Sequence, residues 1–273
     1  MASRSTLFFS AIHKSALNKT VVTAAVLMVL GYPGATVYAA EAESADATKI
    51  EAALEKAMAD SARPDSDKAR DKNRKPIETL NFFGLQEDMR VVELLPGGGW
   101  YTRLLAPVLR ERGELFVALG TTGVETRLLD KDGFDKVEVL AKNTKFERRG
   151  GLAHIEALNL GVKRVDMVLT FRNMHNFDES SREIMNEAVF TALKRGGLYG
   201  IVDHTRRHMQ KSDSENRRRM DPVLAIKEVE AAGFEFVDFS DLHYKLDDEL
   251  RYEVGRRSVT GNTDRFTLLF KKP

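Results

Sequence analysis

The residues best suited to chemistry gather first around three consecutive glycines, Gly97, Gly98 and Gly99. An apolar run at 91–95, interrupted only by Glu93, precedes them, and leucines at helical spacing follow from Thr102. The order is therefore strand, glycine turn and helix. Glycine lets a ligand approach the backbone, and a helix start offers unpaired N–H groups. The pattern is typical of a loop that binds a nucleotide cofactor; a flexible turn without a ligand is the simpler interpretation.

The loop does not follow the G-x-G-x-x-G fingerprint of dinucleotide-binding proteins. Counted from Gly97, the third glycine position falls on Thr102. An acid for the ribose is expected about 20 residues further along, and residues 116–120 contain none. The sequence therefore disfavours NAD as the ligand.

Polar residues also follow two later apolar runs. Residues 172–176 come directly after the run at 167–170, and Asp203 and His204 end the run that begins at residue 198. Because ligands of open α/β sheets bind beyond the carboxyl ends of the strands, we expect these residues to converge with the glycine loop. His175 is the first candidate for a general base, since free histidine titrates near neutral pH. Asp203 and His204 are second candidates, and a structural histidine is the alternative for His175.

A metal site is not predicted. His204 and His208 are four residues apart, which would place them on one helix face beside Asp203. Zinc needs three or four ligands, and no H-E-x-x-H pattern accompanies this pair. The basic run at 217–219 is interpreted as a solvated face, with an anion clamp as the less favoured alternative.

The charged stretch at 65–75 has two interpretations. One is a solvated helix with ion pairs such as Asp67 with Arg70, or Asp71 with Lys75. The other is an active-site lid that contributes Arg70 or Arg74.

The strand and glycine loop resemble the first motif of class I S-adenosylmethionine-dependent methyltransferases, E-x-x-x-G-x-G, with Glu93, Gly97 and Gly99 at its defined positions. More narrowly, the chain resembles a group of predicted exported bacterial methyltransferases. That resemblance rests on residues 70–76, 169–176, 193–197, 202–204 and 261–266. It spans nearly all of the chain beyond residue 45.

The resemblance implies a cofactor, S-adenosyl-L-methionine, and positions for its parts. Residues Gly97 to Gly99 would face the methionine part, Asn173 would lie near the sulfonium, and Glu93 would hold the amino group directly or through water. Two positions depart from the family pattern. Leu95 replaces the first motif glycine, and residues 119–122 lack the acid that binds the ribose hydroxyls.

Several substitutes for the missing acid are open. The hydroxyl of Thr121 or Thr122 could bind the ribose, or Glu125 could reach back to it. A ligand smaller than the full cofactor is the remaining alternative.

The resemblance further implies methyl transfer to an unidentified small-molecule acceptor, with Arg74, Trp100, Tyr101 and Arg172 as candidate substrate-binding residues. Plain packing is the alternative for the two aromatic residues. Because the sulfonium supplies its own leaving group, the protein mainly aligns the reactants and excludes water. A non-catalytic exported binding protein on a methyltransferase scaffold is the alternative function.

Alternating strands and helices from Met89 onward predict an α/β fold, a Rossmann-like, seven-stranded, mostly parallel sheet flanked by helices, with an N-terminal helical extension. Strands are predicted at 91–95, 114–119, 136–140, 167–170, 198–203, 234–239 and 265–271. Helices are predicted at 47–59, 102–110, 125–131, 179–193 and 222–232. The predicted domains are a signal peptide at 1–39, the helical extension at 40–80 and a methyltransferase-like domain at 81–273.

Residues 1–40 have the pattern of a secretory signal. They contain no Asp or Glu, and Arg4, Lys14 and Lys19 precede the apolar run at 21–30. Val37 and Ala39 occupy the positions that signal peptidase reads, which predicts a mature chain beginning at Ala40 or within two residues of it. Ten apolar residues fall short of the roughly 20 needed to span a bilayer, so no stable membrane span is expected after cleavage. The predicted location is therefore outside the cytoplasm, in the periplasm.

The composition restricts the partners. The chain has 42 basic and 41 acidic residues, and removing the three basic residues of the signal leaves 39 against 41. No nucleic-acid partner is expected from this balance. With no cysteine, disulfides and a cysteine-linked lipid anchor are excluded. S-adenosylmethionine is made in the cytoplasm, so export requires either that the cofactor reaches the periplasm or that the ligand differs. The oligomeric state is not predicted.

Overall fold

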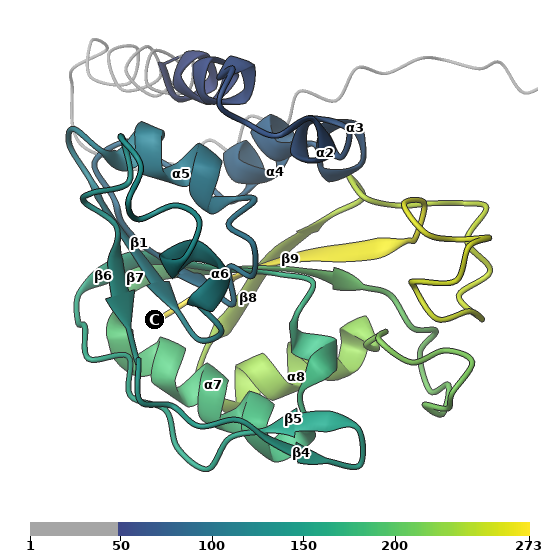
Figure 1. Cartoon of the computed structure of the whole chain (residues 1–273). Helices are drawn as coiled ribbons and strands as arrows, with labels where there is room; N and C mark the ends of the chain where they lie inside the picture. The colour runs from purple at the N-terminus through teal and green to yellow at the C-terminus, as the bar shows by residue number, and fades with distance from the viewer. Residues whose placement is uncertain (1–48) are drawn as a thin grey trace, which may run out of the picture. The chain divides into compact units, whose positions relative to one another are not determined.

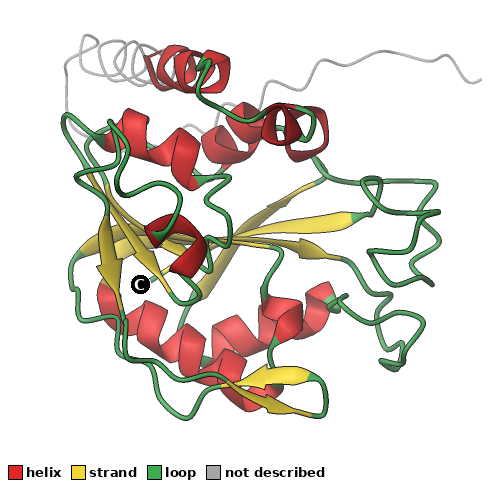
Figure 2. Cartoon of the chain, in the orientation of Figure 1, coloured by secondary structure: helices red, strands yellow, loops and turns green. Residues whose placement is uncertain are grey.

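The computed structural model describes residues 49–273, which form a seven-stranded sheet with helices on both faces (Figures 1 and 2). The strands of this sheet are β1 (Arg90–Leu94), β2 (Glu114–Ala118), β3 (Glu138–Leu140), β6 (Val165–Phe171), β7 (Leu193–His204), β8 (Glu235–Ser240) and β9 (Arg265–Lys271). Strands β4 (Glu147–Arg149) and β5 (Leu152–His154) form a separate antiparallel pair. The predicted signal peptide and its cleavage site lie outside the described residues.

The helices occupy the N-terminal part of the described chain and the connections between strands. Residues 49–59 are helical. The others are α2 (Asp65–Lys68), α3 (Asp71–Arg74), α4 (Pro76–Phe82), α5 (Thr102–Leu109), α6 (Thr122–Glu125), the 3-10 turn η1 (Met174–Asn176), α7 (Glu179–Ala192) and α8 (Pro222–Ala231). Within residues 49–273, no helix has both the length and the apolar character needed to cross a membrane.

The order of the strands is β3-β2-β1-β6-β7-β9-β8. Strand β1 pairs in parallel with β2 on one side and with β6 on the other, and only β9 runs antiparallel to its neighbours. The chain thus winds outward from β1 in one direction and then returns to β6. Such a reversal opens a crevice at the carboxyl ends of the two central strands. The predicted seven-stranded, mostly parallel sheet is confirmed.

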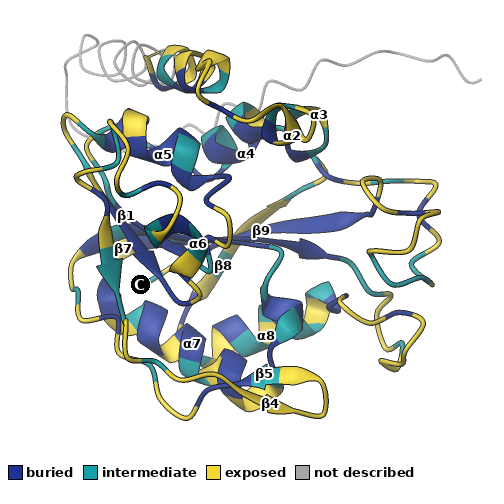
Figure 3. Ribbon diagram, in the orientation of Figure 1, coloured by how far each residue is buried: buried dark blue, intermediate teal, exposed yellow. Residues whose placement is uncertain are grey.

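Two apolar cores cover the two faces of this sheet. Successive strand residues point to opposite faces, so Val91 packs with α4, α5 and helix 49–59, whereas Val92 packs with α7 and α8. The buried central strands in Figure 3 match the nearly unbroken apolar sequence of β1 and β6. The rigid sheet therefore holds the ends of β1 and β6 in fixed positions.

Two local predictions are wrong. The helix expected at 125–131 is instead the short α6, four residues long and begun earlier, because Leu119 and Gly120 take positive φ angles that turn the chain directly into it. His204 and His208 do not share a helix face. The antiparallel ladder with β9 extends through His204, which pairs with Arg265 and is the last residue of β7.

Candidate functional site

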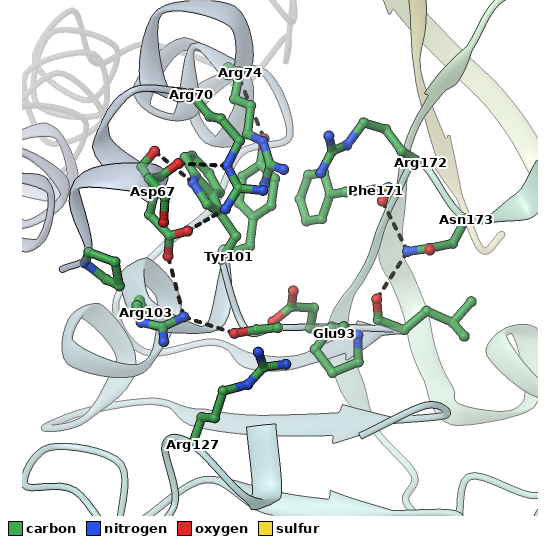
Figure 4. Close-up of a pocket in the computed structure, with 17 residues that line it drawn as sticks. Asp67, Arg70, Arg74, Glu93, Tyr101, Arg103, Arg127, Phe171, Arg172 and Asn173 are labelled. Atoms are coloured by element: carbon green, nitrogen blue, oxygen red, sulfur yellow. Dashed lines mark hydrogen bonds and ion pairs between the residues drawn. The ribbon is translucent and has the colours of Figure 1, made fainter. Parts of the chain in front are cut away.

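A pocket of about 410 Å³ lies at the carboxyl ends of β1 and β6 (Figure 4). Its walls come from four parts of the chain, namely residues 64–74 of the α2–α3 segment, residues 93–103 from β1 through the glycine loop to the start of α5, Arg127 beyond α6, and residues 171–173 at the end of β6. Leu94 pairs with Thr170 in the sheet, so the loops that follow these strands begin side by side. The volume of the pocket lies within the range of small-molecule sites.

The three glycines have different roles. Gly97 and Gly98 line the pocket, whereas Gly99 does not. Gly99 has φ +79°, and a Cβ atom there would come within 2.4 Å of the Leu128 side chain, so packing requires glycine. At Gly98 a Cβ atom would meet only the end of Arg127, at 3.5 Å. Gly98 is therefore open to the pocket and free of backbone strain.

Glu93 is a buried acid in the wall of the pocket. Its side chain accepts a hydrogen bond from Thr102 Oγ1 at 2.6 Å, and no ion pair to it is formed within residues 49–273. Burial raises the pKa of Glu93 to about 7, although the Thr102 hydrogen bond and the charge of Arg74 act in the opposite direction. A bound cation would restore the ionised form, so this wall suits an ammonium group.

Asn173 ties the two central loops together. Its Nδ2 atom donates to the carbonyl oxygens of Leu95 and Phe171, each at 3.0 Å. Leu95 and Arg172 both take left-handed φ angles, +56° and +63°, which turn the chain sharply at the ends of β1 and β6. The predicted pocket residue Asn173 is thus part of the site and fixes its shape.

The four candidate substrate-binding residues, Arg74, Trp100, Tyr101 and Arg172, all line the pocket. The Arg74 guanidinium lies over the Trp100 ring, 4.3 Å from its centroid. Tyr101 stacks on Phe171 with ring centroids 3.5 Å apart. The aromatic residues therefore pack within the wall and also border the pocket.

The α2–α3 segment is part of the pocket and not a fully solvated helix. Asp67 and Arg74 are buried, and Trp100 Nε1 donates to the Asp67 carbonyl oxygen at 3.0 Å. The predicted pair of Asp67 with Arg70 is present. Asp71, however, pairs with Arg63 at 2.7 Å and not with Lys75, because Lys75 ends α3 in a left-handed conformation.

Thr121 lies outside the pocket, contrary to its predicted role. Its hydroxyl donates to Glu125 Oε1 at 2.5 Å. The carboxylate of Glu125, the acid considered as an alternative ribose ligand, is therefore already hydrogen-bonded. A Cβ atom at Gly123 would fall 2.1 Å from the Gly97 carbonyl oxygen, so α6 packs directly against the glycine loop. The pocket residues therefore fit the amino-acid part of S-adenosylmethionine, while the ribose has no evident partner among the described residues that line it.

The three candidate catalytic residues come together, but they do not line the pocket. Asp203 accepts from the His175 backbone N–H at 3.0 Å and from the His204 backbone N–H at 2.7 Å, and it bonds the His175 ring at Nδ1 (2.5 Å). His204 bonds Thr263 Oγ1 at 2.9 Å. Burial, followed by the charge of Arg265, holds the pKa of His204 well below its usual value.

The basic run at 217–219 is also not a purely solvated face. The Arg219 side chain is fully buried and binds Asp248 through two hydrogen bonds of 2.9 and 3.0 Å. No cluster of metal-ligating side chains is found in residues 49–273. Arg219 therefore has a structural partner and does not clamp a ligand.

Two pocket arginines, Arg103 and Arg127, were not identified from the sequence. Arg103 Nη1 donates to the carbonyl oxygens of Gly98 and Gly99 at 2.8 and 3.2 Å, and Arg127 Nε donates to that of Gly123 at 3.1 Å. The spacing of Arg103, one helical turn beyond Gly99, is a signal that would have found it. No comparable signal marks Arg127, because its position depends on the unexpected geometry of α6.

Solved structures that are similar in fold include methyltransferases. A SAM-dependent methyltransferase from Aquifex aeolicus matches with a TM-score of 0.50 and 18% sequence identity, over 82% of this chain and 97% of that one. The glycopeptide N-methyltransferase MtfA matches with a TM-score of 0.48 and 16% identity, over 74% of this chain and 96% of that one. No protein-family model and no curated protein sequence matches the chain. The strand order and the likeness to the Aquifex structure together show that the chain has the Rossmann-like fold of S-adenosylmethionine-dependent methyltransferases.

Proposed function

We propose that the protein is an S-adenosylmethionine-dependent methyltransferase that acts on a small-molecule acceptor. The observation that carries the proposal is Glu93, a buried acid without a cationic partner in the described chain, in a pocket bordered by the open backbone of Gly97 and Gly98. An acid and a glycine backbone at the reversal of strand order suit a ligand with an ammonium and a carboxylate. The methionine part of the cofactor has both groups.

Different pocket residues contact different parts of this cofactor. Glu93 holds the ammonium, the loop at Gly97 and Gly98 lies along the methionine part, and Asn173 lies on the sulfonium side. The cofactor supplies the methyl group and its own leaving group. The chain aligns the acceptor and excludes water, to which the covering segment 64–74 contributes.

Proton removal from the acceptor, where the acceptor requires it, is assigned to His175. Asp203 bonds His175 Nδ1 and so fixes the orientation of the ring. His175 follows directly on the pocket residues Arg172 and Asn173, but its side chain is only 4% exposed. The proposal therefore requires an acceptor to approach the end of β6.

A second candidate function is a non-catalytic binding protein for a ligand smaller than S-adenosylmethionine. It is favoured by the packing of Gly123 against Gly97, and by the bond between Thr121 and Glu125, where the family pattern provides ribose contacts. In either case, the pattern at 1–39 supports a proposal of export to the periplasm, with a mature chain that begins at Ala40. An intact-mass measurement of the exported protein tests the cleavage site.

Calorimetric titration of the mature chain with S-adenosylmethionine tests the proposed function. Wild type should bind, and Gly98→Val should weaken binding at least about tenfold, or about 1.4 kcal/mol. The added side chain enters the pocket at a position without backbone strain, so the melting temperature should change little. Gly98→Ala is the matched control, because its Cβ meets Arg127 at an ordinary contact distance and should have a smaller effect. Equal affinity in wild type and a folded Gly98→Val variant would exclude this loop as the site, and no binding by wild type would favour the second function.

A further inference from the structure

The pocket has an excess of positive charge. Five arginines line it against two acids, Asp67 and Glu93. Asp67 pairs with Arg70 and lies 3.4 Å from Arg103, while Arg127 donates to a backbone carbonyl. Two arginines, Arg74 and Arg172, remain.

Within residues 49–273, the side chains of Arg74 and Arg172 make no hydrogen bond or ion pair, although Arg74 is only 5% exposed and its Nε atom is fully buried. Other buried arginines among residues 49–273 have hydrogen-bond partners, although that of Arg265 is only the Asn73 carbonyl oxygen, at 2.6 Å. Arg219 has Asp248, and Arg182 binds Glu228 through two hydrogen bonds of 2.6 and 2.7 Å. A buried charge without a partner is strongly unfavourable. An anionic ligand in this pocket would supply the partner that the described residues do not.

The two unpaired arginines also act on each other. Burial, followed by the neighbouring charge of Arg172, lowers the pKa of Arg74 to about 8. Burial likewise lowers the pKa of Arg172. An oxyanion between the two would remove both penalties, because a guanidinium binds the oxygens of a carboxylate or phosphate through two parallel hydrogen bonds.

We propose that Arg74 and Arg172 bind a carboxylate or phosphate group of the methyl acceptor, so that the substrates are small anionic molecules. The identification of the anion as part of an acceptor rests on the function proposed above. Arg74 comes from α3 and Arg172 from the end of β6, on the side of the pocket above Glu93 in Figure 4. Arg103, by contrast, donates to the carbonyl oxygens of Gly98 and Gly99, in the loop along which the methionine part of the cofactor is proposed to lie.

Inorganic phosphate is the probe for this site. Calorimetric titrations at pH 7 and constant ionic strength would compare wild type with Arg74→Met and Arg172→Met, which keep the length of the side chain without its charge. The control is Arg195→Met, since Arg195 is exposed and belongs to the amino-terminal part of β7, at the opposite edge of the sheet. Phosphate affinity should fall about 10- to 100-fold in each pocket variant and remain unchanged in the control.

The affinity for S-adenosylmethionine in the same variants identifies the source of the anion. An acceptor site predicts that Arg74→Met and Arg172→Met bind the cofactor as wild type does, and that phosphate and cofactor bind together. Competition between the two, with weaker cofactor binding in both variants, would assign the arginines to the cofactor carboxylate and overturn the proposal. Phosphate binding that is absent, or equal in all four proteins, would overturn the anion site itself.

The two proposals fail separately. Phosphate binding that depends on Arg74 and Arg172, in a protein that does not bind S-adenosylmethionine, would uphold the anion site and refute the methyltransferase. A folded Arg172→Lys variant checks the geometry, because lysine keeps the charge but not the paired donors. It should recover only part of the phosphate affinity.

Discussion

Two polar clusters each include a residue that follows β6, Arg172 in one and His175 in the other, and the two clusters differ in the partners of their side chains. In the first cluster, Arg74 is buried and Arg172 half-buried, and neither guanidinium has a hydrogen bond or ion pair in the described chain. In the second, formed by His175, Asp203 and His204, each side chain makes at least one hydrogen bond within the protein. The fold leaves the first cluster without a counter-ion, whereas hydrogen bonds within the protein hold the second in place.

This difference separates two kinds of contribution to function. Groups that are already paired hold a geometry, and removing one leaves a buried partner unsatisfied. Unpaired buried groups lower the stability of the protein and remain available to bind a ligand. Changes in the His175 cluster should therefore affect stability or turnover, and changes in the arginine pair should affect binding.

The largest expected effect is that of His175→Asn on turnover. Loss of a general base should lower the rate by about 10²- to 10⁴-fold, with the affinity for S-adenosylmethionine nearly unchanged. The assay would follow formation of the demethylated cofactor with a panel of small carboxylated and phosphorylated phenols, amines and thiols. Asparagine keeps a polar group near Asp203, so the variant should still fold.

The matched control for this variant is His154→Asn. His154 is likewise buried and bonds the carboxylate of Asp178 at 2.8 Å, but it belongs to β5, away from the pocket lining. Both variants should lose a similar free energy of unfolding, about 1–3 kcal/mol, and only His175→Asn should lose turnover. Equal activity in the two variants would leave His175 with a structural role alone.

The sequence predicted the parts of the site that depend on local pattern. The apolar runs located β1 and β6, and glycine content located the loop between β1 and α5, and Glu93, Gly97 and Asn173 from these segments all line the pocket. Their convergence follows from the parallel sheet alone. These features are set by periodicity and strand order, which a single sequence contains.

The other parts depend on geometry that the spacing of residue types does not determine. Asp71 pairs with Arg63 and not with Lys75, and Thr121 bonds Glu125 and does not line the pocket. Likewise, the pairing of β7 with β9 extends a strand through His204, where local spacing suggested a helix. The unpaired state of Arg74 is a property of the assembled pocket and has no local signal.

The second expected effect concerns Glu93 and pH. Its pKa is about 7 in the folded protein, against an ordinary value of 4.5. Between these values the folded state keeps a proton that the unfolded state has lost, so stability falls as pH rises from 4.5 to about 7. Glu93→Gln removes this loss and should raise the free energy of unfolding at pH 8 by up to about 3 kcal/mol, with little change at pH 4. Denaturant titrations at the two pH values measure it, and parallel stability curves for the two proteins would show that Glu93 is not perturbed.

The smallest expected effect tests the unpaired arginines without any ligand. Arg74→Met removes a buried charge that has no ion pair or side-chain hydrogen bond in the described chain, and it keeps apolar contact with Trp100. The free energy of unfolding should therefore rise by about 1 kcal/mol, which corresponds to about 2–4 °C in melting temperature. The comparison variant is Arg219→Met, which leaves Asp248 buried and unpaired and should destabilise the protein by about 3–5 kcal/mol.

If paired and unpaired arginines differ as argued, Arg74→Met should raise the free energy of unfolding and Arg219→Met should lower it. The two side chains are chemically identical and both are buried, so only their partners differ. Thermal and denaturant unfolding should be measured in a phosphate-free buffer, since a bound anion would stabilise wild type and hide the gain in Arg74→Met. Adding phosphate should then stabilise wild type more than Arg74→Met and reduce or reverse their difference. A loss of stability in Arg74→Met comparable to that in Arg219→Met would mean that Arg74 is satisfied within the fold, and the pocket would no longer require an anion.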